Sequence, residues 1–432
     1  MLGGAAKGAD LVRAAVPEFA RALGTAVRGP IQVVVPEGPV PILVLHATAL
    51  LAVLEARDRP PVGSVRVVAS EQVLAGLLDR ERTFWLGSAR TAGLAGPGGL
   101  DSVTAAQAVA VACLITVVDE SGAAQALRRV PGLTDAPSGQ LRKIARWLRQ
   151  LYPTERADTA VGGTRWWGYL QPDLLAERHV VYQLADAADF ANACLQGLTP
   201  EQARGALTVL ARACAHRAQA PALIAAALRE ELTTLGVPAI AVAIQTGGRL
   251  GGILADVFAH ANASLATLIQ FEEAIPYPSV ALAEAAAVLA ERINLTLPED
   301  AELAEIARWR HRLGLLFAQA GRPDQALAVT QEAITAYREL AGTSPDRYRP
   351  DLALSLNNLG VCLWELGRPA DALPVTQEAI TAYRELAATS PDRYRPYLAE
   401  SLDNLTARFS TLGRGAEAEA ACAEAQAIHR VS

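Results

Sequence analysis

A 46-residue repeat in the last third of the chain constrains its fold more than any other feature. The related motifs "GRPDQAL", "GRPADAL" and "GRGAEAE" begin at Gly321, Gly367 and Gly413, so both offsets are 46 residues. The longer segment "TQEAITAYREL" begins at Thr330 and recurs without change at Thr376. Periods of about 20 to 50 residues are the signature of arrays in which each unit packs on its neighbours. We therefore expect a repeat array in this part of the chain.

Each unit has the pattern of a helical hairpin. In the central copy Leu356, Leu359, Leu363 and Leu366 share one face of a helix, because their spacing follows the helical period. Gly367 suits the end of this helix, and a proline two residues later suits the first turn of the next. The segment "SPDRYRP", at residues 344–350 and 390–396, is predicted to connect one hairpin to the next.

This unit resembles the tetratricopeptide repeat. The signature of that family, Leu-Gly followed by a glycine and two alanines, occurs at Leu359-Gly360, Gly367, Ala372 and Ala379. The first copy has it at Leu313-Gly314, Gly321, Ala326 and Ala333, and the third copy keeps less of it, with Thr406 after Leu405. The unit is longer than the usual 34 residues or so, and in this it is similar to the repeats of kinesin light chain and bacterial sensor proteins. The resemblance implies an α-solenoid that binds a protein or peptide on its concave face.

Four side chains are candidates for lining that face as a peptide-binding groove: His311, Asn357, Trp364 and Asp403. Three of them hold the equivalent position one turn before the Leu-Gly pair, and Trp364 lies one turn after it. Asn357 is expected to contact the ligand, since an apolar core has little use for an amide. For Trp364, contact with a peptide and packing against the next hairpin are alternatives of equal weight.

The chain upstream of the repeats divides into three predicted segments: a small helical domain at residues 1–100, a winged-helix-like domain at 101–185 and irregular helical hairpins at 186–300. Within the hairpin segment, breaks are expected at Thr199-Pro200, Gly236–Pro238, Gly247–Gly248 and Pro276–Pro278. The repeats occupy residues 301–432. A wing is expected in "GGTRWWGYLQPD", residues 162–173, where two glycines precede a group of aromatic residues. The predicted fold class is therefore all-α: a winged-helix-like module, with only this short β-wing, followed by an α-solenoid.

A basic helix face raises the question of DNA binding. Arg142, Lys143, Arg146 and Arg149 fall largely on one side of the helix predicted at residues 138–151. Such a helix could enter a major groove. The alternative is a solvated or inter-domain face, and the net charge of −6 favours it over nucleic acid.

The order of several motifs is similar to the part of actinobacterial STAND/NB-ARC-type regulators that follows their nucleotide domain. The motifs are "GPVPILVLHATALLAVL" (38–54), "LLDRERTFW" (77–85), "RVPGL" (129–133), "WLRQLYP" (147–153) and "WWGYLQPDLLAERHV" (166–180). In that family a Gly-x-Pro motif touches nucleotide; here only Gly38, Pro39 and Pro41 could form it. His179 is near the position of a nucleotide-sensing histidine. However, the chain has no G-x-x-x-x-G-K-[ST] phosphate loop, so we expect no nucleotide site in it.

No cofactor or metal is expected either. No two of the six histidines lie within one helical turn, and no catalytic motif is present. The five cysteines are scattered, as free thiols in a reducing compartment are, and the N-terminus does not read as a signal peptide. With no apolar run long enough for a bilayer, we expect a cytoplasmic protein. Only two basic residues, Lys7 and Lys143, are lysines, a bias typical of a GC-rich bacterial genome.

These observations predict a non-catalytic regulator or scaffold whose partner is a protein or peptide, with no membrane role. One alternative is the detached sensor half of a STAND-type signalling ATPase whose nucleotide domain lies on another chain. A second is a winged-helix transcription regulator, although nucleic acid is not the expected partner. A third is an enzyme with an unfamiliar site.

Overall fold

The computed structural model describes residues 5–25, 31–35, 42–58, 65–68, 71–96, 99–154 and 165–430. Within these ranges the chain forms twenty α-helices, one short 3₁₀ helix and two four-residue strands, which confirms the predicted helical class. Its contacts divide it into two compact units, Met1–Val242 and Ala243–Ser432. The four segments predicted from sequence divide the chain more finely and stay predictions.

The first unit contains, after its first helix, a β-α-β element that the sequence did not predict. Strands β1 (Ile31–Val34) and β2 (Val65–Val68) pair in parallel, with Ile31 opposite Val65, and α2 (Ile42–Asp58) connects them. The predicted fold class, in which a short wing was the only β-structure, was therefore wrong on this point. Four-residue runs of β-branched side chains are too short to reveal a period, so sequence alone does not separate them from helix. The Gly-x-Pro candidates Gly38, Pro39 and Pro41 lie outside the described residues.

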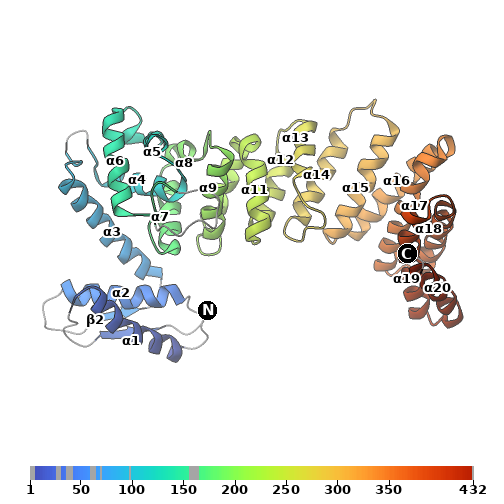
Figure 1. Ribbon diagram of the computed structural model, residues 1–432, viewed down its shortest axis with the longest axis horizontal. Helices are drawn as coiled ribbons and strands as arrows, with labels where there is room; N and C mark the ends of the chain where they lie inside the picture. The colour runs from blue at the N-terminus through green and yellow to red at the C-terminus, as the bar shows by residue number, and fades with distance from the viewer. Residues whose placement is uncertain are drawn as a thin grey trace. The chain divides into compact units, whose positions relative to one another are not determined.

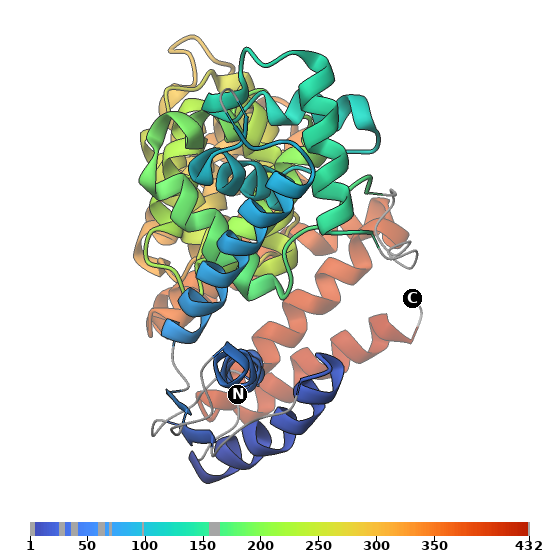
Figure 2. The same ribbon diagram turned by 90° about the vertical axis from the view of Figure 1, so that its left-hand side faces the viewer.

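A buried helix organises the rest of this unit. Every residue of α4 (Ser102–Leu114) from Thr104 onward is buried, and Asp101 caps the helix by accepting a hydrogen bond from the Thr104 amide. A helix that is apolar on all sides must be surrounded by others. The helices that contact α4 are α3 (Glu71–Thr91), α5 (Glu120–Leu127), α7 (Asp173–Asp186) and α9 (Pro200–Ala213). Figure 2 shows α3 as one uninterrupted helix.

The remaining elements of the first unit are α1 (Ala5–Ala22), η1 (Pro131–Leu133), α6 (Ser138–Leu151), α8 (Ala188–Leu195) and α10 (Ala220–Glu230). Helix α6 has the bounds predicted for the helix at residues 138–151. The expected wing is not seen: residues 155–164 lie outside the described ranges, and residues 165–172 form no strand. Instead Trp167 is buried, and its indole donates to the carbonyl of Ile115 at 3.1 Å. This side-chain anchor and two backbone hydrogen bonds, from Trp166 to Val117 and from Gly168 to Tyr152, both at 2.7 Å, hold the segment without a strand ladder.

Two arginine side chains cap the C-terminal ends of helices by donating hydrogen bonds to the last carbonyl groups. The Arg129 guanidinium, in the "RVPGL" motif, donates to the carbonyls of Ala193 at 2.6 Å and Gln196 at 2.7 Å at the end of α8. Arg292 donates in the same way to the Ala259 carbonyl at 2.6 Å, at the end of α12 (Leu250–His260). The last carbonyls of a helix have no partner within it, and a cation there also interacts favourably with the helix dipole.

The boundary between the two units falls within α11 (Leu232–Thr246). A break expected at residues 236–238 is absent, because α11 continues through Pro238 and the chain breaks at Glu231 instead. An interior proline removes one backbone hydrogen bond, which here does not end the helix. The breaks expected at Thr199 and at Gly247–Gly248 are confirmed: Thr199 forms a capping box, and both glycines have positive φ.

The second unit consists of helices that pair in sequence. After α12 come α13 (Leu265–Glu273) and α14 (Ala283–Thr296). The last six helices form the three predicted hairpins, visible as successive pairs in Figure 1. They are α15 (Leu303–Gln319) with α16 (Pro323–Thr343), α17 (Pro345–Glu365) with α18 (Pro369–Thr389), and α19 (Pro391–Thr411) with α20 (Gly415–His429). No helix in the described part of the chain is long and apolar enough to span a bilayer.

The "SPDRYRP" segment is not a connector. Pro345 and Pro391 are the first residues of α17 and α19, so a single serine separates each of these helices from the one before it. Proline suits this position because the first helical amide needs no partner within the helix. Tyr394 of the second segment is buried in the core of the last hairpin. The prediction mistook the first turns of a helix for a loop.

In each of the first two hairpins, a glycine of the first helix lies directly against a threonine of the second helix. A Cβ atom on Gly314 would lie 2.4 Å from Oγ1 of Thr330, and one on Gly360 would lie 2.4 Å from Oγ1 of Thr376. Only a residue without a side chain allows this separation. The third copy has Thr406 where the others have glycine, and this explains its weaker match to the repeat signature.

Successive hairpins are joined on their second helices by a repeated ion pair. The Arg338 guanidinium donates to both carboxylate oxygens of Glu378, at 2.8 and 2.9 Å. One repeat later, Arg384 donates to Glu424 at 2.8 and 2.6 Å. Bidentate geometry fixes orientation as well as contributing energy. These pairs are exposed, so each contributes on the order of 0.2–1 kcal/mol at most.

We expect Gly360→Ala to lower the free energy of unfolding by about 1–2 kcal/mol. Forced contacts in packed helices cost roughly 1–3 kcal/mol, which outweighs the gain of at most about 1 kcal/mol in helix propensity. Gly342→Ala, in α16 where nothing lies within 4 Å of the added Cβ, is the matched control and should be neutral or stabilising. Urea denaturation measures both. If Gly360→Ala costs as much in a Thr376→Ala background as alone, the close contact with Thr376 is not the cause.

Candidate functional site

The candidate groove residues lie on one face of the first helix of each hairpin. On α17, Leu354, Asn357, Val361 and Trp364 follow the spacing that places side chains on one side of a helix. We call the equivalent positions of all three helices the first-helix face. Its residues are Arg308, His311, Leu315 and Ala318 on α15, the four named on α17, and Glu400, Asp403, Ala407 and Ser410 on α19. Of these twelve side chains only Asn357 is buried.

Two of the predicted groove residues hydrogen-bond to the next repeat. His311 Nδ1 lies 2.8 Å from the hydroxyl of Ser355, and the Ser401 hydroxyl donates to Asn357 Oδ1 at 3.2 Å. Each bond joins neighbouring first helices, α15 to α17 and α17 to α19. Asn357 is 8% exposed, so its amide oxygen serves packing between repeats. Ser355 and Ser401 occupy equivalent positions, 46 residues apart. This recurrence of a serine was the sequence signal that could have indicated hydrogen bonds between repeats.

Asp403 takes the same position in the third repeat but has different surroundings. It is exposed, and its carboxylate lies 3.1 Å from Nε2 of His429 on α20, which is also exposed. The predicted groove residues thus change from partly buried at His311, through buried at Asn357, to exposed at Asp403.

Trp364 combines the two alternatives considered for it. One part of its side chain packs against the apolar core between α16, α17 and α18, and the rest remains accessible. The Arg408 guanidinium lies 5.8 Å from the centre of its ring, within range for a cation–π interaction. The indole is therefore held in place while still presenting a surface.

Arg408 was not predicted and is the least expected residue of this region. It is 4% exposed and hydrogen-bonds the Thr376 hydroxyl, and no acidic side chain in the described ranges pairs with it. Burial lowers the pKa of Arg408 from its usual value. The equivalent residues of the other repeats are Cys362 and Leu316, both buried. Aligning the three copies would have identified it as a charge at a core position.

The predicted basic face is exposed on α6, opposite buried Leu141, Ile144, Trp147 and Leu148. Two of its four cations interact within the chain. Arg146 pairs with Glu120 at 2.9 Å, and Arg149 lies 4.9 Å from the centre of the Trp166 ring. Arg142 and Lys143 point to solvent.

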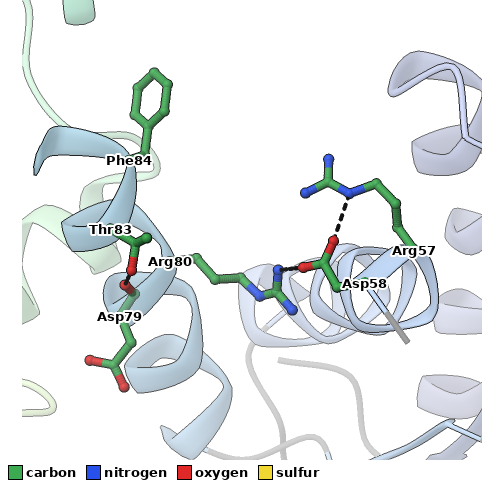
Figure 3. Close-up of a pocket in the computed structure, with 6 residues that line it drawn as sticks. All are labelled: Arg57, Asp58, Asp79, Arg80, Thr83 and Phe84. Carbon is green, nitrogen blue, oxygen red and sulfur yellow. Dashed lines mark hydrogen bonds and ion pairs between the residues drawn. The ribbon is translucent and has the colours of Figure 1, made fainter. Parts of the chain in front are cut away.

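An open cavity of about 530 Å³ lies between α2 and α3, and Figure 3 shows the side chains that line it. At the end of α2, Asp58 accepts hydrogen bonds from Arg57, at 2.9 Å, and from Arg80 of α3. Hydrogen bonds from Arg80 and then Arg57 lower the pKa of the Asp58 carboxyl. Phe84 points away from this group and is exposed. With Asp79 the lining carries two charges of each sign, so it offers no net attraction to an ion.

His179 does not have the exposure that a nucleotide-sensing residue needs. It is fully buried, its Nε2 lies 2.9 Å from the Ala106 carbonyl, and its ring packs edge-on against Trp85. Burial lowers the pKa of His179 to about 4, so the ring is neutral at pH 7. Among the residues that the structure describes, no group of three potential metal ligands comes together.

Residues 305–385 match the family model of the tetratricopeptide repeat. This match covers α15 to α17 and most of α18, and it confirms the repeat type predicted from sequence. No curated protein matches the chain. Among solved structures the chain is similar to a circular tandem repeat protein with novel repeat topology and enhanced subunit contact surfaces, at 13% identity over 98% of this chain and 88% of that chain. The TM-score of 0.18 is too low to support any argument from that protein.

We expect His311 to make the array less stable in acid. Burial, followed by the nearby Arg312 cation, lowers the pKa of His311 to about 4. The unfolded chain takes up the proton near pH 6.5 and the folded chain only near pH 4, so stability falls as the pH drops through this window. The loss approaches the order of 3 kcal/mol at pH 4.

His311→Asn removes the titrating group and keeps a partner for Ser355, because Asn357 occupies the equivalent position. Urea midpoints at pH 7.5 and 4.5 should therefore differ less in this variant than in the unchanged protein. Equal differences would show that His311 does not cause the pH dependence.

Proposed function

We propose that this chain is a non-catalytic scaffold that binds a protein or peptide on the first-helix face of its tetratricopeptide repeats. Trp364 carries the proposal: a large aromatic side chain, fixed from one side and accessible from the other, stands at the middle of the three repeats. Partly buried aromatic anchors of this kind contribute most of the binding energy in many interfaces. The repeats themselves support the proposal, because repeats of this type generally mediate protein–protein interaction.

Asn357 has a different part in this proposal from the one its sequence position indicated. Its amide oxygen accepts a hydrogen bond from Ser401, so it sets the spacing of α17 and α19. Asn357→Ala would then weaken binding only by disturbing the array, whereas Trp364→Ala would remove the contact itself.

Site-specific photo-crosslinking in the cells that encode this chain tests the function. A benzoylphenylalanine at Val361, next to Trp364 on the face, should capture a defined partner, and Trp364→Ala should abolish the capture. The same group at Glu339, exposed on the second helix α16, is the control and should not capture that partner. Equal capture at the two positions would contradict the assignment of the face.

A second candidate function is the detached sensor half of a STAND-type ATPase. The parallel β1–β2 pair with its crossover helix favours it, because β-α-β units of this kind build nucleotide-binding domains. With no phosphate loop in this chain, the nucleotide would have to bind another chain. Co-purification of a phosphate-loop ATPase with the tagged chain tests this, and recovery of the chain without one would count against it.

The basic face of α6 gives less support to a transcription regulator. Arg146 and Arg149 interact with Glu120 and Trp166, which leaves Arg142 and Lys143 for phosphates. Two phosphate contacts provide little of the electrostatic affinity on which DNA-binding domains depend.

A further inference from the structure

The side chains of the first-helix face that remain available for binding indicate which kind of ligand would suit it. This inference rests on the proposed function. The polar groups at the centre of the face are already used. His311 and Asn357 hydrogen-bond to Ser355 and Ser401, so neither needs a ligand. What α17 still presents is apolar: parts of Leu354, Val361 and Trp364.

The side of the face formed by α19 is acidic. Glu400 is exposed and has no ion-pair partner within the described part of the chain, where Asp403 pairs with His429, which is itself exposed. The helix on the other side, α15, presents Arg308 at the position equivalent to Glu400, and this cation lies 3.8 Å from the Glu305 carboxylate. Across three neighbouring helices the face therefore changes from a paired cation through apolar side chains to two carboxylates.

Arg408 is not one of the charged groups that a ligand would contact. Its guanidinium is enclosed between Thr376 and the Trp364 ring and is 4% exposed. A cation on the buried side of an indole stabilises the ring's orientation through the negative π face. Arg408 is therefore a positioning residue for Trp364, and the charges that a ligand meets on the α19 side of the face are those of Glu400 and Asp403.

We infer that the array recognises a peptide segment in which an apolar side chain stands next to a basic one. The apolar side chain would pack on Trp364 and Val361, and the lysine or arginine would face Glu400 and Asp403. Burial of the apolar group contributes most of the affinity. The charge pairs, which remain near solvent, determine orientation and exclude acidic segments.

Selection from a phage-displayed library of random 12-residue peptides on the immobilised full-length chain tests this. We expect enrichment of peptides with an apolar residue within a few positions of lysine or arginine. Trp364→Ala should lower recovery of these phage at least tenfold. The double charge reversal Glu400→Lys with Asp403→Lys should instead select acidic peptides. Because both carboxylates are exposed, this variant should fold, and its thermal midpoint checks that it does.

The matched control is Glu339→Lys with Glu419→Lys, which reverses two exposed carboxylates on the second helices α16 and α20. It should select the same peptides as the unchanged protein, with recovery within about twofold. An equal effect of the two reversals would mean that net charge alone selects the peptides, and the inference would be wrong.

The remaining outcomes separate the inference from the function on which it rests. If Trp364→Ala abolishes recovery but the selected peptides are acidic or uncharged, the face binds peptides and the inferred ligand is wrong. If neither Trp364→Ala nor the charge reversal changes the selection, the peptides bind elsewhere and the proposed site is wrong. Absence of any enrichment would overturn both.

Discussion

The contact between a glycine and a threonine in each of the first two hairpins is the constraint on which the array depends. Gly314 and Gly360 let their helices approach until the threonine hydroxyl of the second helix lies where a Cβ would be. Helices this close have little freedom to slide or rotate, because close-packed interiors leave few alternative arrangements. The separation thus fixes how the two helices of each of these hairpins pack on one another. The serine bonds between first helices and the ion pairs between second helices then join one hairpin to the next.

The hairpins could be predicted because the same pattern occurs in three copies, and agreement between copies is evidence that a single segment cannot supply. An apolar stripe that recurs at a fixed offset, ended each time by glycine, has few interpretations. Single features were less reliable. Pro345 was taken as part of a connector although it begins α17, since proline suits both a loop and a first helical turn. Pro238 was taken as a break although α11 continues through it. Tertiary packing decided both cases, and local sequence does not show it.

The site residues show the same limit. Position in the repeat placed His311, Asn357, Trp364 and Asp403 on one face, but not which of them were engaged by neighbours. Whether an amide faces a ligand or a serine of the next repeat depends on contacts made across 44 residues of sequence. For Arg408, the alignment of the three copies shows a cation where the other two repeats have a cysteine and a leucine, so its unusual position could have been predicted. Its contact with the Trp364 ring could be seen only in the structure.

The ion pairs between second helices make the 46-residue unit interchangeable. The segment repeated at Thr330 and Thr376 carries both an arginine for the following copy and a glutamate for the preceding one, so Glu378 and Arg384 belong to a single unit. A further copy inserted between the second and third hairpins would meet a complementary partner on each side without any other change. Tandem duplication of the encoding DNA could therefore lengthen the array, and with it the surface it presents, in single mutational steps.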